Sequence, residues 1–395
     1  MFRIIDIARE ISSGITPLRS NSEYWENGTI PWLKTEQIGE YRIKTTNEFV
    51  TEKALESTGL KLYPKNTISI AMYGEGKTRG NVSIIDCPMT TNQACCNIVV
   101  NESIVAPFYL YYFFKTQYHN LRQLSSGVRK NLNTNDIKNY LINLPNKITQ
   151  QNIVNFLCSI DEKIELNNKI NLELEKIAKT LYEYWFVQFD FPDENERPYK
   201  SSGGKMIYNE ILKREIPIDW EVKTIEQNIK KSFSSKKISS NNYQNYGKIP
   251  IIDQSPQFIC GYTNDVDYLI KYDKKPYIVF GDHSCTLKLV NFDFARGADG
   301  TQIIICGNEN INQYYLYFAI KNIKLSSSYE RHYKYLKDSK IVIPNNTNLT
   351  NKFEIITGDI YANIRKNIQE NNLLVLLRDF LLPMLMNGQV SIIAE

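Results

Sequence analysis

Apolar residues recur at every seventh position through residues 148–189, apart from a central asparagine, and a second row of the same kind follows four residues behind the first. The first row consists of Ile153, Ile160, Asn167, Leu174 and Leu181, and the second consists of Leu157, Ile164, Asn171, Ala178 and Trp185. This is the a/d pattern of a helix whose seam packs against another helix. We therefore expect one long helix over residues 148–189, in which residues 153–185 span about 50 Å at 1.5 Å per residue.

The pattern returns 200 positions later. The row Phe353, Ile360, Asn367, Leu374 and Leu381 keeps the character of the first row, including its central asparagine. A companion row is apolar at both ends and polar in the middle, and it consists of Ile356, Asn363, Glu370, Leu377 and Met384. The segments before the two helices also match, because 141–145 and 341–344 each read as a short strand that ends at a proline. The chain is therefore predicted to be an internal duplication.

The sequence outside the helices is rich in Ile, Val, Tyr and Thr, in short runs separated by Gly, Asn and Asp. Such runs predict mixed α/β globules (an α+β class) with mostly antiparallel strands. The predicted order is a first globule over 1–147, a helix over 148–189, a linker over 190–217, a second globule over 218–346 and a helix over 347–395. Two matched seams favour an antiparallel intramolecular coiled coil that separates two similar domains with pseudo-two-fold symmetry. A homodimeric coiled coil is the alternative, since a/d seams also pair between chains.

Composition narrows the class of protein. The chain is 42% hydrophobic and 23% charged, which is typical of ordered globular domains. Its net charge of +4 permits nucleic-acid binding without requiring it. Seven cysteines without a C-x-x-C pair, together with only three histidines, argue against a zinc site and favour reduced thiols in the cytoplasm. The most apolar run, 373–385, is too short and too charged to cross a membrane.

Several short motifs occur in an order that is specific as a set. They are Gly14-Ile15-Thr16-Pro17, Tyr24-Trp25, Gly28-Thr29-Ile30-Pro31-Trp32, Gly80-Asn81-Val82, Thr91-Asn92-Gln93, the helix end Leu181-Tyr182-Glu183-Tyr184-Trp185-Phe186, Glu370-Asn371-Asn372-Leu373 and the distal run 376–383. In this order they resemble the specificity subunits of type I restriction-modification enzymes, over nearly the whole chain. The second globule departs from the pattern, because it lacks the Tyr-Trp…Ile-Pro-Trp opening and begins at Ile216-Pro217 instead.

The resemblance implies a non-catalytic subunit that gives DNA methylation and phage defence their sequence specificity. It implies two target-recognition domains that each read half of a bipartite double-stranded DNA site. The paired helices would set the spacing and dock two modification (methyltransferase) subunits, and restriction subunits where the cell has them. S-adenosylmethionine, ATP and Mg²⁺ would then belong to the partner subunits, with no cofactor on this chain.

The motifs of catalysis are missing from the sequence. There is no G-x-x-x-x-G-K-[ST] phosphate loop, no G-x-G-x-x-G and no Asn/Asp-Pro-Pro-aromatic motif. One nuclease-like string places Asp193 before Glu221 and Lys223, the residue types that hold a catalytic divalent metal. We predict no catalytic residue and no metal site, and keep a single-chain Mg²⁺-dependent nuclease and a stand-alone coiled-coil DNA-binding regulator as alternatives.

Basic, amide and aromatic side chains in Gly- and Tyr-rich segments are the DNA-binding candidates, because these residue types grip phosphates and read base edges. In the first globule they are Lys34, Thr35, Tyr73, Lys77, Thr78, Arg79, Arg129, Lys130 and Asn131. In the second they are Lys236, Lys237, His283, Ser284, Arg331, His332, Tyr333 and Tyr335. The alternative for each is a solvated surface residue.

The sequence leaves two alternative roles for each of two groups of residues on the helices. Tyr184, Trp185 and Phe186 either pack on the start of the second helix or dock a modification subunit, since aromatic residues are enriched in both settings. The seam asparagines Asn167, Asn171 and Asn367 either fix the register of the helices or mark a place where the seam opens to water.

Overall fold

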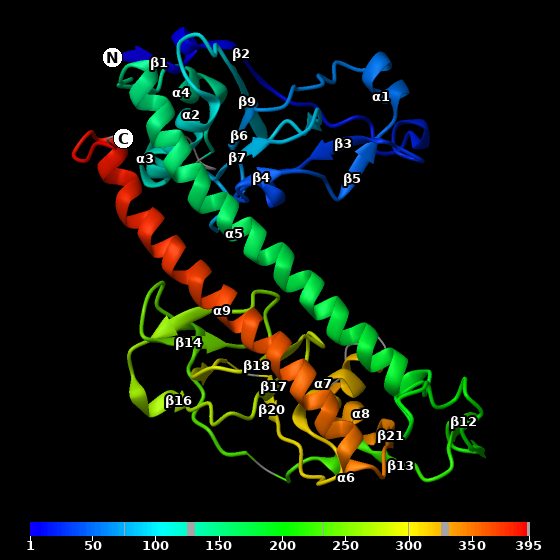
Figure 1. Ribbon diagram of the computed structural model, residues 1–395. Helices are drawn as coiled ribbons and strands as arrows, with labels where there is room; N and C mark the ends of the chain where they lie inside the picture. The colour runs from blue at the N-terminus through cyan, green and yellow to red at the C-terminus, as the bar shows by residue number, and fades with distance from the viewer. Residues whose placement is uncertain (75, 125–130, 232, 299, 325–331, 393–395) are drawn as a thin grey trace. The chain divides into compact units, whose positions relative to one another are not determined.

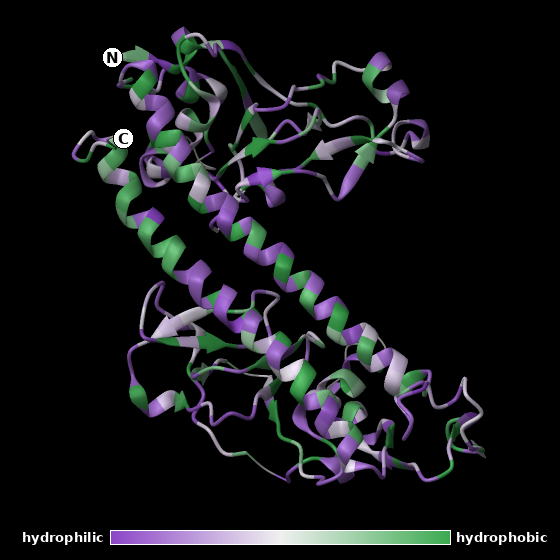
Figure 2. Cartoon of the chain, viewed as in Figure 1, coloured by the Kyte–Doolittle hydropathy of each residue, from purple (hydrophilic) through white to green (hydrophobic). Residues whose placement is uncertain are grey.

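Both predicted long helices are present in the computed structural model, which describes residues 1–395 except 75, 125–130, 232, 299, 325–331 and 393–395 (Figure 1). Helix α5 covers Lys147–Tyr182 and helix α9 covers Thr347–Met386. Hydrophilic and hydrophobic residues alternate along both helices (Figure 2). The chain divides into unit 1, which is Met1–Leu166 with Asn371–Glu395, and unit 2, which is Asn167–Glu370. Each unit thus combines a globule with a stretch of α5 and a stretch of α9.

The globule of unit 1 is built on a five-stranded sheet of order β2-β9-β6-β7-β4. Its strands are β2 (Ala8–Ser13), β9 (Cys95–Val100), β6 (Ile68–Ala71), β7 (Val82–Ile85) and β4 (Arg42–Ile43). All neighbours are antiparallel except β4 and β7. A three-stranded sheet joins β5 (Glu48–Val50), β3 (Ile30–Leu33) and β8 (Thr90–Thr91), and a separate pair joins β1 (Phe2–Arg3) to β10 (Leu141–Ile142).

Helices α2 (Pro107–Thr116), α3 (Tyr118–Leu124) and α4 (Thr134–Lys138) pack against the five-stranded sheet. Helix α1 (Glu52–Ser57) packs instead against the three-stranded sheet, through Ala54. Helix α2 starts at a proline, whose fixed φ suits the first helical turn. Its buried aromatic residues share one core with Ile153 and Leu157 of α5 and with Leu382 and Leu385 of α9. The globule is therefore anchored to both long helices through α2.

Unit 2 also contains two larger sheets, which have three and four strands. One sheet has the order β18 (Leu287–Val290), β17 (Tyr277–Gly281), β20 (Thr301–Ile304), and another has the order β15 (Gly261–Thr263), β14 (Ile249–Ile252), β19 (Phe294–Arg296), β16 (Leu269–Ile270). A pair joins β13 (Glu221–Thr224) to β21 (Lys340–Ile343). The helices are α6 (Ile225–Asn228), α7 (Gln313–Lys321) and α8 (His332–Asp338).

The duplication predicted from the helices extends to the pairing of the strands. Strand β6 lies between β7 and β9, as β17 lies between β18 and β20. In both units the next helix is aromatic, α2 or α7, and a short strand, β10 or β21, leads into a long helix. That strand pairs in each case with the first strand of the globule. The mixed α+β fold class expected from the sequence is confirmed.

The two long helices run antiparallel where they meet. In unit 2, Asn167 Nδ2 donates to Glu370 Oε2 at 2.7 Å, and Asn367 Nδ2 donates to Asn171 Oδ1 at 2.8 Å. As the residue number rises along α5, from Asn167 to Asn171, the number of the partner on α9 falls, from Glu370 to Asn367. Because Asn167 is fully buried, the seam is closed at this position and the asparagines form a polar layer that fixes register.

The seam of α9 is offset from the predicted one. Leu377 and Ile356 of the predicted companion row are 45% and 41% exposed. The residues four positions after the first row, Thr357, Ile364 and Leu385, are buried instead. The predicted companion row is wrong at Ile356 and Leu377, because it follows the first row by three residues, whereas these buried positions follow it by four.

The stretch predicted as a linker contains ordered structure. After α5, a π-helical turn covers Glu183–Val187, and strands β11 (Met206–Asn209) and β12 (Arg214–Pro217) form an antiparallel hairpin. The ring of Phe191 stacks 4.6 Å from Tyr199 and 5.2 Å from Trp220. Aromatic stacking therefore folds this stretch onto the start of the second globule. The predicted domain boundaries themselves stay predictions.

Candidate nucleic-acid interface

In unit 1 the loop between β6 and β7 carries the predicted group 73–79. Tyr73 and Lys77 are exposed there. Helix α3 holds the loop, because Tyr118 Oη donates to the main-chain oxygen of Lys77 at 2.9 Å and Arg122 Nη1 donates to that of Arg79 at 2.9 Å. These two bonds fix the backbone of the loop while the side chain of Lys77 faces solvent.

A second predicted group lies beside this loop. The main-chain nitrogen of Leu132 donates to the oxygen of Met72 at 3.1 Å, so that Asn131 lies next to the start of the loop. Thr134 Oγ1 contacts the sulfur of Met72 at 3.7 Å and strengthens the same junction. The structure therefore brings Asn131 together with the 73–79 group. The other members of this group, Arg129 and Lys130, lie outside the described residues.

Lys34 and Thr35 belong to a different edge of unit 1. Lys34 Nζ forms ion pairs with Glu48 at 2.6 Å and Glu36 at 2.9 Å. The hydrogen bond to Glu48 raises the pKa of Lys34, and the hydrogen bond to Glu36 raises it further. Thr35 opens the 3-10 turn Thr35–Gln37. Because two carboxylates already compensate Lys34, it is a weaker candidate for DNA than Lys77.

In unit 2 the corresponding loop, 282–286 between β17 and β18, lies against the start of α8. Asp282 is buried, and its main-chain oxygen accepts the N–H of His332 at 3.1 Å. Its carboxylate Oδ1 accepts the N–H of Tyr333 at 2.8 Å. The structure therefore joins the predicted groups around His283 and around 332–335, in the topological position of the unit 1 site. Arg331 lies outside the described residues.

The side chains of this second site divide into exposed and buried ones. His283, Ser284 and Tyr335 are exposed, and Tyr335 is 53% accessible. His332 is only 5% exposed, so its burial gives no support to its prediction as a DNA-binding residue. It shares the buried face of α8 with Leu336, four residues on, as helical spacing requires. Tyr333 is partly buried against Phe280, with ring centroids 6.2 Å apart.

Lys236 and Lys237 lie beside strand β19. Lys236 Nζ pairs with Asp267 at 2.7 Å, and the hydrogen bond to Asp267 raises the pKa of Lys236. Lys237 is exposed and forms a parallel bridge with Arg296. Both lysines are exposed, and the charge of Lys236 is already compensated by a carboxylate.

The aromatic group at the end of α5 is mostly core. Trp185 and Phe186 are 7% and 2% exposed, and both rings contact Phe353 at the start of α9, at 6.2 and 5.1 Å. The structure therefore favours the packing alternative for these two residues, and their burial gives no support to a role in subunit docking. Tyr184, at 38% exposed, keeps an accessible ring.

The residues of the nuclease alternative have structural roles. The Asp193 carboxylate accepts the N–H groups of Asn195 and Arg197, both at 2.8 Å, and the bond from Arg197 is the main reason that the pKa of Asp193 is lowered. Glu221 and Lys223 pair with each other at 2.5 Å on β13. Within the described part of the chain, no three His, Cys, Asp or Glu side chains gather as a metal site would require.

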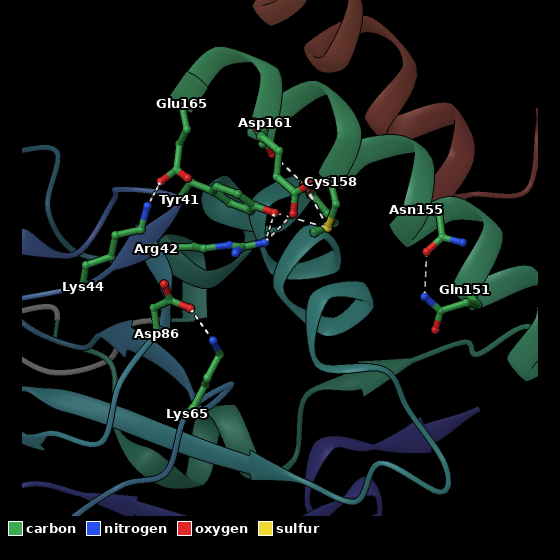
Figure 3. A network of polar contacts seen from close by, with 12 residues as sticks. Tyr41, Arg42, Lys44, Lys65, Asp86, Gln151, Asn155, Cys158, Asp161 and Glu165 are labelled. Atoms are coloured by element: carbon green, nitrogen blue, oxygen red, sulfur yellow. Dashed lines mark hydrogen bonds and ion pairs between the residues drawn. The ribbon is translucent and has the colours of Figure 1, made fainter. Parts of the chain in front are cut away.

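A polar network that the sequence did not predict ties the globule of unit 1 to α5 (Figure 3), and the same network reaches α9 through Arg378. Asp161 of α5 accepts a hydrogen bond from Tyr112 Oη at 2.7 Å and pairs with Arg378 of α9 at 2.5 Å. Burial alone would lower the pKa of Arg378, but the charges of Asp161 and Asp379 raise it. At the sheet edge Arg42 pairs with Glu162 at 2.8 Å, so β4 is fixed to α5 as well.

Comparison with known proteins shows which proteins the chain resembles. Residues 1–176 match the type I restriction modification DNA specificity domain. The MjaIX type I restriction enzyme specificity subunit of Methanocaldococcus jannaschii is 29% identical, over 99% of this chain and 93% of that relative. The HindI specificity subunit of Haemophilus influenzae is 26% identical, over 73% and 79%.

A solved structure shows the same fold. The type I restriction-modification S subunit from M. genitalium superposes with a TM-score of 0.56 at 19% identity, over 97% of this chain and 95% of that one. In the described residues of this chain, no helix is both long and apolar enough to span a bilayer. Over nearly its whole length the chain is therefore similar to the specificity subunits of type I restriction enzymes, and its first 176 residues match their DNA specificity domain.

Proposed function

We propose that this chain reads a bipartite double-stranded DNA target, with one recognition domain, 1–147 or 218–346, for each half. The observation that carries the proposal is the shared position of the two candidate sites. In each globule the loop after a central strand lies beside the segment that leads into a helix, and exposed polar side chains gather there. A repeated scaffold with different side chains at one position is suited to reading two different half-sites.

The proposed contacts use the exposed members of each group. In unit 1 these are Tyr73 and Lys77, with Asn131 beside them; in unit 2 they are His283 and Tyr335. Lysine and tyrosine hold phosphates, and amide or imidazole groups offer donors and acceptors to base edges. Arg129, Lys130 and Arg331 stay in the proposal on their sequence context alone.

We further propose that two modification subunits dock on this chain and carry the S-adenosylmethionine, and that ATP and Mg²⁺ are bound by other partner subunits. An exposed apolar stripe on the unit 1 stretch of α9 supports a docking role. Its members are spaced as one helix face and are 68%, 46%, 45% and 68% exposed: Leu373, Leu376, Leu377 and Phe380. Such a stripe is costly to leave in water, which favours a permanent partner.

Modification in vivo tests the reading function. The chain is co-expressed with its modification subunits in a host that lacks DNA methylation, and modified bases are mapped by single-molecule sequencing. We expect one bipartite motif. Lys77→Ala should relax one half of the motif and His283→Ala the other. If either single variant alters both halves equally, the assignment of one domain to one half-site is wrong.

Co-purification tests the docking stripe. The double variant Leu373→Asp with Phe380→Asp should lose the modification subunit, because each aspartate places a charge where the partner buries apolar surface. Leu62→Asp is the matched control, since Leu62 is an exposed leucine of unit 1, 47% accessible, on a loop outside the stripe. Retention of the modification subunit by the double variant would refute the proposed surface.

A further inference from the structure

In unit 2 a second loop, 253–260 between β14 and β15, is joined to the candidate recognition loop 282–286. The main-chain oxygen of Gln254 accepts a hydrogen bond from Ser284 Oγ at 2.7 Å, and Gln254 Oε1 accepts the N–H of His283 at 3.3 Å. Ser284 is thus held by the protein itself, although it is exposed. The two loops form one edge, on which His283 stands next to residues that the sequence analysis did not select.

Two glycines permit this close contact. A Cβ atom on Gly281 would lie 2.7 Å from the Cβ of Gln254, and one on Gly300 would lie 2.8 Å from Gln254 Nε2. Gly300 also has a φ of +79°, which a residue with a side chain rarely adopts. A side chain at position 281 or 300 would therefore displace Gln254 from its place beside both residues.

The side chain of a buried lysine forms hydrogen bonds to the main chain of loop 253–260. Lys288 of β18 is 4% exposed, and its Nζ donates to the main-chain oxygens of Asp253 at 2.9 Å and Gln257. Burial lowers the pKa of Lys288, while Cys260 and Asp253 act in the opposite direction. The ion pairs of the described chain include none for Lys288. A buried ammonium held by carbonyls costs stability, so stability alone does not explain why a lysine stands here.

The loop held in this way presents Gln257 to solvent. Its main-chain oxygen is fixed by Lys288, whereas the residue as a whole is exposed. A glutamine amide carries a donor and an acceptor side by side, the pattern that pairs with the major-groove edge of adenine. A fixed backbone with an exposed amide is a suitable base-reading arrangement, because little conformational freedom is lost on binding.

We propose that loop 253–260 is a second recognition loop of unit 2, in which Gln257 contacts a base edge and Lys288 is a positioning residue. The proposal rests on the DNA-reading function proposed above and extends it to residues of a loop that has no counterpart among the sequence candidates. It predicts that part of one half-site is read by Gln257, independently of His283.

The decisive experiment uses the full chain with its modification subunits and a plasmid library in which both half-sites are randomised. Lys77→Ala first identifies the half read by unit 1. Gln257→Ala should then reduce discrimination at one or two base pairs of the other half by about 5- to 150-fold. Gln188→Ala, which removes an exposed glutamine from the end of the π-helical turn, is the control and should leave the motif unchanged. An unchanged motif with Gln257→Ala, or an equal loss on all sequences, overturns the proposal.

Lys288→Met tests the positioning role, since methionine keeps most of the side-chain length and removes the charge. We expect faster amide exchange in 253–260 and relaxed preference in the same half as Gln257→Ala, with the other half read normally. Faster exchange with an unchanged motif overturns the positioning role, and if Lys288→Met does not fold, Gln257→Ala still decides whether the loop reads DNA. If the parent protein itself produces no bipartite motif, the proposed function fails rather than this inference.

Discussion

Replacing Asp161 should destabilise unit 1 more than any change to a surface charge of that unit. Asp161 joins three helices, because it binds Tyr112 of α2 and Arg378 of α9 from its own position on α5. The side chains of Asp161 and Arg378 are only 4% and 17% exposed. Asp161→Asn keeps the shape of the residue but leaves a largely buried guanidinium without its inner partner.

The expected loss follows from that burial. Breaking a buried pair by removing one partner costs about 3–5 kcal/mol. Arg378 keeps Asp379 at 2.8 Å and has some access to water, so we expect about 2–3 kcal/mol here. Glu165→Gln is the matched control on the same helix: its pair with Lys44 is 28% and 42% exposed, and its loss should cost at most about 1 kcal/mol.

Urea denaturation followed by tryptophan fluorescence and circular dichroism measures both variants, and a double-mutant cycle with Arg378→Met tests the reasoning. The double variant should lose less stability than the sum of the two single variants, by about 1 kcal/mol or more, because it leaves no uncompensated charge in the core. Additive losses would show that Asp161 and Arg378 do not act as a pair, and the account of this network would be wrong.

Three further outcomes follow from burial and backbone conformation. Burial raises the pKa of Cys95 and of Cys96 to about 12, so iodoacetamide at pH 8 should leave both thiols unmodified in the native protein while it labels the less buried Cys87, as peptide mass mapping will show. Phe353→Ala should destabilise unit 2 by about 3–5 kcal/mol in urea unfolding, because the ring is fully buried. Gly80→Ala should cost about 1–3 kcal/mol and weaken reading of one half-site in the modification assay, because the φ of Gly80 is +88°.

The long helices could be predicted from the sequence because their seams are mostly apolar, and the error on α9 has a physical cause. Three of the five positions that follow its first row by four residues are polar: Thr357, Asn371 and Arg378. Thr357 is buried because its hydroxyl donates to the main-chain oxygen of Phe353 at 2.6 Å, and Arg378 because Asp161 compensates it. Partners on other elements make these positions suitable for burial, and a hydropathy pattern contains no information about them.

At the candidate site, too, the sequence predicted exposed residues better than polar residues that distant partners bury. Their residue types pointed to Lys77 and His283 as candidates, and both are exposed where a loop after a central strand meets another segment of the chain. The burial of His332 could have been predicted from Leu336 four residues on, which places both on one helix face. Lys288 could not, since lysine is almost always exposed and only the carbonyls of a distant loop account for its burial.

The two candidate sites share a scaffold, but different hydrogen bonds hold it in place. In unit 1, Tyr118 and Arg122 donate from a neighbouring helix to carbonyls of the loop. In unit 2 the direction is reversed, because Asp282 of the loop accepts N–H groups from the start of a helix. Since these bonds fix only the backbone, the exposed side chains at the two loops are free to differ without altering the fold. Under the proposed function, this separation of supporting residues from contacting residues lets one duplicated architecture read two unlike half-sites. A change in a supporting residue should then relax recognition of one half of the target, whereas a change in an exposed residue should alter which bases that half contains.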